Sequence, residues 1–183
     1  MKVIVWSIAC LLWLQAARAQ DSIYTCRNAE VSFFSSAPIE DIEARTNQGV
    51  SALNLRAGSI YFKIPVNTFQ FEESLMQEHF NSDYLESDKY PYAEFRGQLQ
   101  SADDLTKNGT HAVTVQGQLT MHGVSKDYQE KGTLIVQDSL VKASSTFKVR
   151  LADHHIKIPR LVIKNIAEVV DVKVSAAYTP GKG

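Results

Sequence analysis

Hydrophobic and polar residues alternate with a period of two along most of the chain after Ser22. In 111–121, four apolar side chains share one face: Val113, Val115, Leu119 and Met121. The same alternation returns in four further segments, 60–66, 94–100, 141–150 and 165–174. A period of two with a single apolar face predicts antiparallel strands that are dry on one side and wet on the other.

Strands of this kind, without long helices between them, are typical of a sandwich or an up-and-down barrel. About eight strands would close a barrel just wide enough to fill itself or to hold one small ligand. Several small residues interrupt the apolar faces, namely Ala93, Gly97, Gly117, Ala143 and Ser145. They either leave room inside the barrel or relieve crowding between strands, and the alternation does not choose between these two interpretations.

The exception to the strand pattern is the segment from Phe69 to about Leu85, which contains no Gly or Pro. At 100° per residue, four of its side chains fall in one arc: Leu75, Met76, His79 and Phe80. This spacing predicts one short amphipathic helix. Because the helix lies between two predicted strands, its apolar face is expected to cover an end or a flank of the sheet.

Residues 1–19 have the features of a cleaved export signal. Lys2 gives a positive start, 3–14 is almost wholly apolar, and Ala17-Arg18-Ala19 is a small-x-small cleavage pattern. The apolar run is shorter than the roughly 20 residues of a membrane span, so a retained anchor is the weaker interpretation. We predict cleavage after Ala19, a single domain over 20–183 with no integral membrane segment, and a periplasmic protein, with secretion as the alternative.

Charge and cysteine content narrow the function classes. Lys2 and Arg18 leave with the signal, so 17 basic and 20 acidic residues remain and the mature net charge is −3. Such a chain, without basic runs, is not expected to bind nucleic acid or an anionic membrane surface. Cys10 also leaves with the signal, so Cys26 has no cysteine partner within the chain and is expected to be a small buried apolar residue.

The sequence carries no recognised catalytic or phosphate-binding motif, and no enzyme activity, metal or cofactor is expected. Adjacent His154 and His155 would point in opposite directions if extended, which disfavours a shared metal, and they are expected on an exposed loop. His122 precedes a glycine at a strand end and is expected to be a hydrogen-bonded structural histidine. His79, in the middle of the apolar arc, either bonds a carbonyl or carboxylate inside the barrel or anchors a ligand head group.

Two strings of residues resemble the bacterial YceI-like family of polyisoprenoid-binding proteins. The first is Met76-x-x-His79-Phe80-x-x-x-Tyr84-Leu85-x-x-x-Lys89-Tyr90-Pro91-x-Ala93-x-Phe95, and the second is Gly117-Gln118-Leu119-Thr120-Met121-His122-Gly123-Val124-Ser125-Lys126. The segment from Asn165 to Tyr178 also fits. The chain departs from the family pattern at Asp153-His154-His155-Ile156, where Asp-Phe-Gly-Ile is often found.

This resemblance implies an all-β fold, an extended eight-stranded antiparallel lipocalin-like barrel with one short amphipathic helix, whose interior holds a long apolar chain. We therefore predict a periplasmic protein that carries or sequesters an isoprenoid-like or fatty-acyl-like ligand. The oligomeric state stays open, with a homodimer among the alternatives. The predicted lining is Phe62, Leu75, Met76, Phe80, Phe95, Val115, Leu119, Met121, Phe147 and Val170, with His79 as a head-group partner.

Two other functions compete with binding. One is an envelope scaffold or stress-response interaction protein with a filled barrel. The other is a lipid-modifying enzyme, which would depend on His79 and a neighbouring acid such as Glu78 or Asp83.

Overall fold

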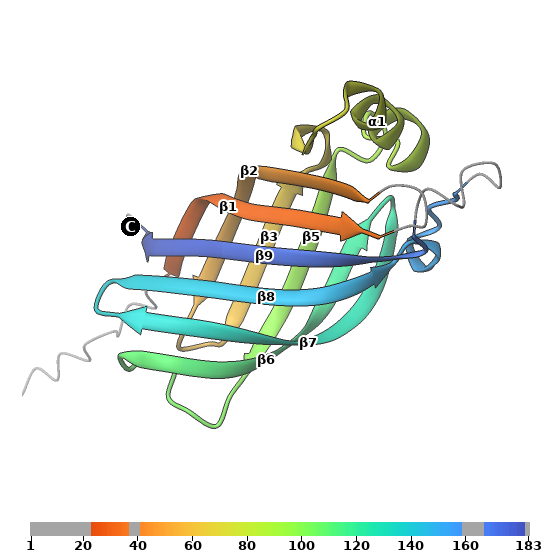
Figure 1. Cartoon of the computed structure of the whole chain (residues 1–183). Coiled ribbons are helices and arrows are strands. Elements are labelled where there is room, and N and C mark those ends of the chain that lie inside the picture. The colour runs from red at the N-terminus through yellow and green to blue at the C-terminus, as the bar shows by residue number, and fades with distance from the viewer. Residues whose placement is uncertain (1–22, 37–40, 159–166, 182–183) are drawn as a thin grey trace, which may run out of the picture.

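The computed structural model describes residues 23–36, 41–158 and 167–181 (Figure 1). The predicted signal at 1–19 therefore lies outside the described residues. Within them the chain forms nine strands: β1 (Ile23–Ser35), β2 (Ile42–Asn54), β3 (Ser59–Pro65), β4 (Gln70–Phe71), β5 (Tyr92–Gln100), β6 (Gly109–Met121), β7 (Val124–Gln137), β8 (Leu140–Arg150) and β9 (Val169–Pro180).

Eight of these described strands close into an antiparallel barrel. The hydrogen-bonded order is β1-β9-β8-β7-β6-β5-β3-β2, and β1 pairs with β2 to complete the circle. The short β4 extends β2 at its edge. The predicted eight-stranded antiparallel barrel is confirmed, and barrel closure removes the exposed sheet edges that an open sheet would carry.

The helix is shorter than predicted. Residues Val66–Thr68 form a 3-10 turn, α1 begins at Ser74 and ends at His79, and a π-helical turn continues it over Phe80–Tyr84. Phe69 and Phe71, two residues apart, instead keep the strand period, and β4 pairs with Ala44 and Arg45 of β2. A further 3-10 turn spans Leu151–His154. No helix among the described residues is long and apolar enough to cross a membrane.

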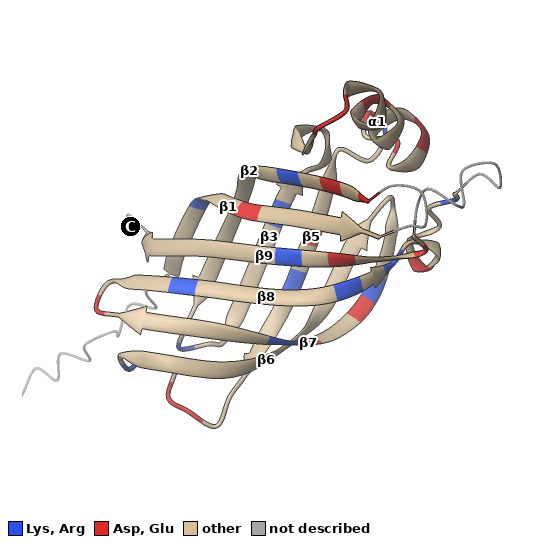
Figure 2. Cartoon of the chain, viewed as in Figure 1, with Lys and Arg blue, Asp and Glu red and all other residues tan. Residues whose placement is uncertain are grey.

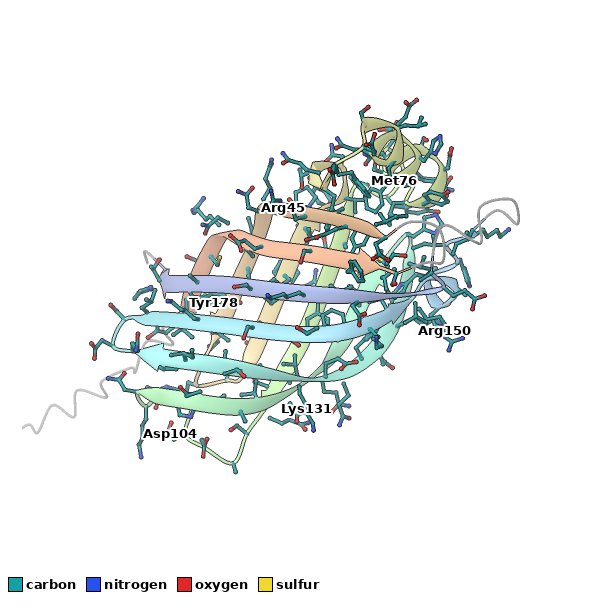
Figure 3. All side chains as sticks on the ribbon, in the orientation of Figure 1. Arg45, Met76, Asp104, Lys131, Arg150 and Tyr178 are labelled. Carbon is teal, nitrogen blue, oxygen red and sulfur yellow. The ribbon has the colours of Figure 1, made fainter. Side chains whose placement is uncertain are left out.

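The two ends of the barrel differ. At the end far from α1 the interior is filled by a buried cluster that includes Leu53, Val136, Val141 and Tyr178. The labelled Tyr178 lies at this end, whereas Met76 lies at the helix end (Figure 3). Cys26 is 3% exposed within the filled cluster, which confirms the predicted buried cysteine.

At the filled end of the barrel, the buried hydroxyl groups of Ser51 and Tyr178 are hydrogen-bonded to each other. Ser51 Oγ donates to the carbonyl of Tyr61 at 2.6 Å, so the Tyr178 hydroxyl, 2.7 Å from Ser51 Oγ, is its donor. Acidic and basic positions are interspersed along the strands (Figure 2).

Candidate functional site

The half of the barrel nearest α1 encloses an apolar cavity of about 240 Å³. All eight barrel strands contribute inward side chains, because alternate residues of every strand face the interior. β4, α1, the π-helical turn and the 3-10 turn at Leu151–His154 add walls at the open half. The lining is predominantly aliphatic and aromatic, which suits a ligand that gains affinity by leaving water.

Most of the predicted lining residues do face this cavity. Nine of them contribute to its walls: Phe62, Met76, Phe80, Phe95, Val115, Leu119, Met121, Phe147 and Val170. The structure thus brings together side chains from β3, α1, the π-helical turn, β5, β6, β8 and β9. Their spacing in the sequence follows from strand alternation, which is why the pattern alone could find them.

Two of the predicted residues lie away from the cavity. Leu75 is 61% exposed and His79 is partly exposed, and neither lines the cavity. Met76 and Phe80 are four residues apart and form the row of helix positions that faces the barrel. Leu75 and His79 form the adjacent row, about 100° away around the helix, and the helical wheel wrongly joined the two rows.

Four phenylalanines form a cluster at the helix end of the cavity. Phe80 lies 5.6 Å from Phe33, 5.6 Å from Phe69 and 5.0 Å from Phe71, between ring centroids. All four rings line the cavity, and each such pair adds about 0.5–1.5 kcal/mol beyond burial of apolar area. We call Phe33, Phe69, Phe71 and Phe80 the phenylalanine cluster. Sequence reasoning found only Phe80, although the two-residue spacing of Phe69 and Phe71 was a usable signal.

The small residues divide into two groups. Ala93, Ala143 and Ser145 line the cavity, so their short side chains leave interior space. Gly97 and Gly117 face each other across β5 and β6, and the Phe95 ring lies against both. These two glycines therefore accommodate an aromatic ring and relieve crowding between strands. Of the five small residues, three leave interior space and two relieve crowding.

The lining also includes polar residues that sequence reasoning missed. Tyr128 and Glu130 of β7 face inward, in the same alternation as Gly132 and Leu134. Burial, followed by the charges of Asp153 and Glu130, raises the pKa of the Tyr128 phenol above its ordinary value. The segment 124–131 reads as polar on both faces, so no apolar stripe pointed to it.

His154 is fully buried, which contradicts the prediction of an exposed loop. Its Nδ1 donates to the carbonyl of Val124 at 3.1 Å, and its Nε2 accepts from the hydroxyl of Tyr128 at 3.0 Å. The two rings stack with 13° between their planes. Desolvation lowers the pKa of His154 below 6.5. The 3-10 turn directs His154 inward, while His155, at φ 58°, stays exposed.

His122 joins three loops at the helix end of the barrel. Its Nδ1 lies 3.0 Å from the carbonyl of His154 and its Nε2 lies 2.7 Å from Oε2 of Glu86. The predicted hydrogen-bonded histidine at a strand end is confirmed. In the part of the chain that the structure describes, no three His, Cys, Asp or Glu residues are grouped so that they could hold a metal ion.

Comparison with known families identifies the fold. The model of the YceI-like domain matches residues 24–178. The chain belongs to the YceI-like domain family. No curated protein matches the chain by sequence.

Solved structures agree with this assignment. A polyisoprenoid-binding domain from Saccharophagus degradans, implicated in plant cell wall breakdown, superimposes with a TM-score of 0.75 at 14% identity, over 87% of this chain and 99% of that one. BcnA from Burkholderia cenocepacia gives 0.70 at 16% identity, over 81% and 95%. A YceI protein from Campylobacter jejuni gives 0.58 at 15% identity, over 74% and 81%. At these identities the likeness concerns the fold.

Proposed function

We propose that this YceI-like barrel binds a long apolar chain, isoprenoid-like or fatty-acyl-like, and carries or sequesters it without making or breaking bonds. The observation that supports this function is the apolar cavity of about 240 Å³ in an otherwise packed barrel. Each methylene removed from water contributes about 0.8 kcal/mol, so a long chain needs few polar contacts. The description of the Saccharophagus degradans relative as a polyisoprenoid-binding domain supports the isoprenoid alternative.

The competing functions have less support. The enzyme hypothesis depended on His79 with Glu78 or Asp83, and His79 does not line the cavity. The scaffold hypothesis required a filled interior, whereas an apolar cavity lies in the half of the barrel nearest α1. Binding accounts for both the hollow half and its apolar lining.

We further propose that the protein works in the periplasm. The support is the sequence of residues 1–19, with Lys2, an apolar run and Ala17-Arg18-Ala19. Amino-terminal sequencing of the protein recovered from periplasmic extracts should find Gln20 as the first residue. Recovery of an uncleaved chain from the cytoplasmic fraction would contradict this location.

Binding is tested by native mass spectrometry of the protein purified from its own host, followed by organic extraction and mass analysis of the released compounds. We expect one prenyl or acyl compound per barrel. Val174→Trp should abolish uptake because Val174 lines the cavity, whereas Ser175→Trp, the next residue on β9, points outward and should not. If a scaffold with a filled barrel were correct, no lipid would be released, and Val174→Trp would unfold the barrel by overpacking.

A further inference from the structure

Strands β7 and β8 are paired with each other along only about half of their length. Their ladder runs from Gln137 and Leu140 to Gly132 and Ser145, where it stops. In contrast, β7 pairs with β6 from Val136 to Val124, and β8 pairs with β9 as far as Arg150. In the backbone ladders, residues 124–131 of β7 therefore pair with β6 only, and residues 146–150 of β8 pair with β9 only. We call this gap in the ladder the β7–β8 parting; Figure 3 labels Lys131, where it begins, and Arg150, where β8 ends.

Side chains hold the two ends of the β7–β8 parting. At one end Ser145 Oγ donates to the carbonyl of Lys131 at 2.7 Å. At the other end His154 bonds both Tyr128 and Val124 of β7. Between these ends the rings of Tyr128 and Phe147 meet edge to face at 6.1 Å across the parting. The parting is thus a defined feature of the wall and borders the cavity, because Tyr128, Phe147 and Ser145 all line it.

Glu130 lies between these two ends and lines the cavity. It is the one charged side chain among the described lining residues, and that lining contains no Lys, Arg or His. No hydrogen bond or ion pair connects its carboxylate to another described side chain. Its charge contributes, after burial and Asp153, to the raised pKa of Tyr128, which lies two residues away on the same face of β7.

A carboxylate at the border of an apolar cavity has a clear preference among ligand head groups. It accepts a charge-assisted hydrogen bond from a hydroxyl or an ammonium group, and such bonds are about twice as strong as neutral ones. It repels a ligand carboxylate or phosphate, because like charges raise each other's energy. Glu130 is itself partly exposed to solvent, so a polar head group that bonds its carboxylate keeps contact with water.

We propose that the polar end of the bound lipid lies in the β7–β8 parting, where Glu130 accepts a hydrogen bond from it, and that the ligand is a long-chain alcohol or amine and not an acid or a phosphate ester. This inference rests on the proposed lipid-binding function and specifies its ligand class. Hydrocarbon burial supplies most of the affinity, and Glu130 selects the head group.

The test uses delipidated full-length mature protein and three probes with one 20-carbon tail: geranylgeraniol, geranylgeranylamine and geranylgeranoic acid. Affinities come from competition with a fluorescent fatty alcohol at neutral pH. We expect the alcohol and the amine to bind at least about tenfold more tightly than the acid. Whichever of the two binds more tightly identifies the natural donor as hydroxyl or ammonium.

Variants assign the preference to one side chain. Glu130→Gln should strengthen binding of the acid about tenfold and collapse the preference, whereas Asp127→Asn, which removes the same charge from the exposed face of β7, should leave it intact. Equal binding of all three probes by the unaltered protein, or an unchanged preference in Glu130→Gln, would overturn this inference while the lipid-binding function stands. Failure of the unaltered protein to bind any probe would overturn both. The comparison of probes on the unaltered protein decides the matter even if Glu130→Gln does not fold.

Discussion

Phe95 of β5 lies directly against Gly117 of β6: a β-carbon on Gly117 would be 2.7 Å from Cζ of the ring. It would also be 2.5 Å from Cα of Gly97, which is the register partner of Gly117. The glycine pair therefore forms the surface on which an inward aromatic ring rests. This arrangement explains how a narrow barrel places a phenylalanine in its wall and still keeps a cavity beside it.

Gly117→Ala should consequently destabilise the barrel by about 1–3 kcal/mol, since the added carbon meets backbone on β5 that cannot move aside. Urea unfolding followed by circular dichroism measures this change. Gly132→Ala is the matched control, because its added carbon would be 3.2 Å from the nearest atom, the carbonyl oxygen of Ser144. Equal stability losses in the two variants would contradict the packing role of Gly117.

The Ser51 and Tyr178 pair predicts an asymmetry between two deletions. Tyr178→Phe leaves Ser51 bonded to Tyr61 and should cost about 1 kcal/mol, whereas Ser51→Ala leaves the buried Tyr178 hydroxyl without its acceptor and should cost about 1–3 kcal/mol. The double variant should lose less stability than the two single losses added together, because the bond can be lost only once. Additive losses would show that the two hydroxyls do not act as a pair. Denaturant unfolding of the unaltered protein, the two single variants and the double variant measures this double-mutant cycle.

Burial of neutral His154 predicts a pH dependence of stability. Because desolvation lowers its pKa below 6.5, the unfolded chain binds the proton more readily than the folded one. Stability should therefore be highest above pH 6.5, fall as the pH is lowered through that value, and stop falling below the depressed pKa. His154→Asn should flatten this slope, at a cost of about 1–3 kcal/mol at neutral pH for the lost Tyr128 contact.

The matched control for this prediction is His155→Asn, which replaces the exposed neighbour. It should leave the unfolding midpoint as pH-dependent as in the unaltered protein. If His155→Asn flattened the slope and His154→Asn did not, the assignment of the slope to the buried ring would be wrong. Urea midpoints recorded between pH 5 and pH 8 are sufficient to distinguish the two.

The fold could be predicted from the sequence in segments where side-chain alternation along a strand was the only rule that applied. The alternation in 111–121 placed β6 and its inward residues, because only side-chain direction determines which face of a strand is buried. The same rule applied to 69–71, yet there the polar residues that follow made a helix look longer than it is. Phe69 and Phe71 pack into the buried cluster inside the barrel, and this burial outweighs the helical preference of the segment.

The candidate site was predictable only where it is apolar. Strand alternation located Val115, Leu119 and Phe147, but Glu130 is a charged residue on an inward face, and polarity alone assigned its segment to solvent. The burial of His154 depends on a 3-10 turn and on Tyr128, 26 residues away in the chain. Contacts of that kind arise from the closed barrel and have no local signature.

The orientation of α1 gives the last prediction. Phe80 contacts the other three rings of the phenylalanine cluster, so Phe80→Ala should open the helix end of the cavity and speed lipid release. The loss of three aromatic pairs should also cost about 1.5–4.5 kcal/mol of stability. Leu75→Ala and His79→Ala alter the row of the same helix that faces away, and both should leave release unchanged. Stopped-flow transfer of a fluorescent fatty alcohol to vesicles measures the rate. Faster release in His79→Ala, with Phe80→Ala unaffected, would mean that the head group leaves past His79 and that the phenylalanine cluster does not close the cavity.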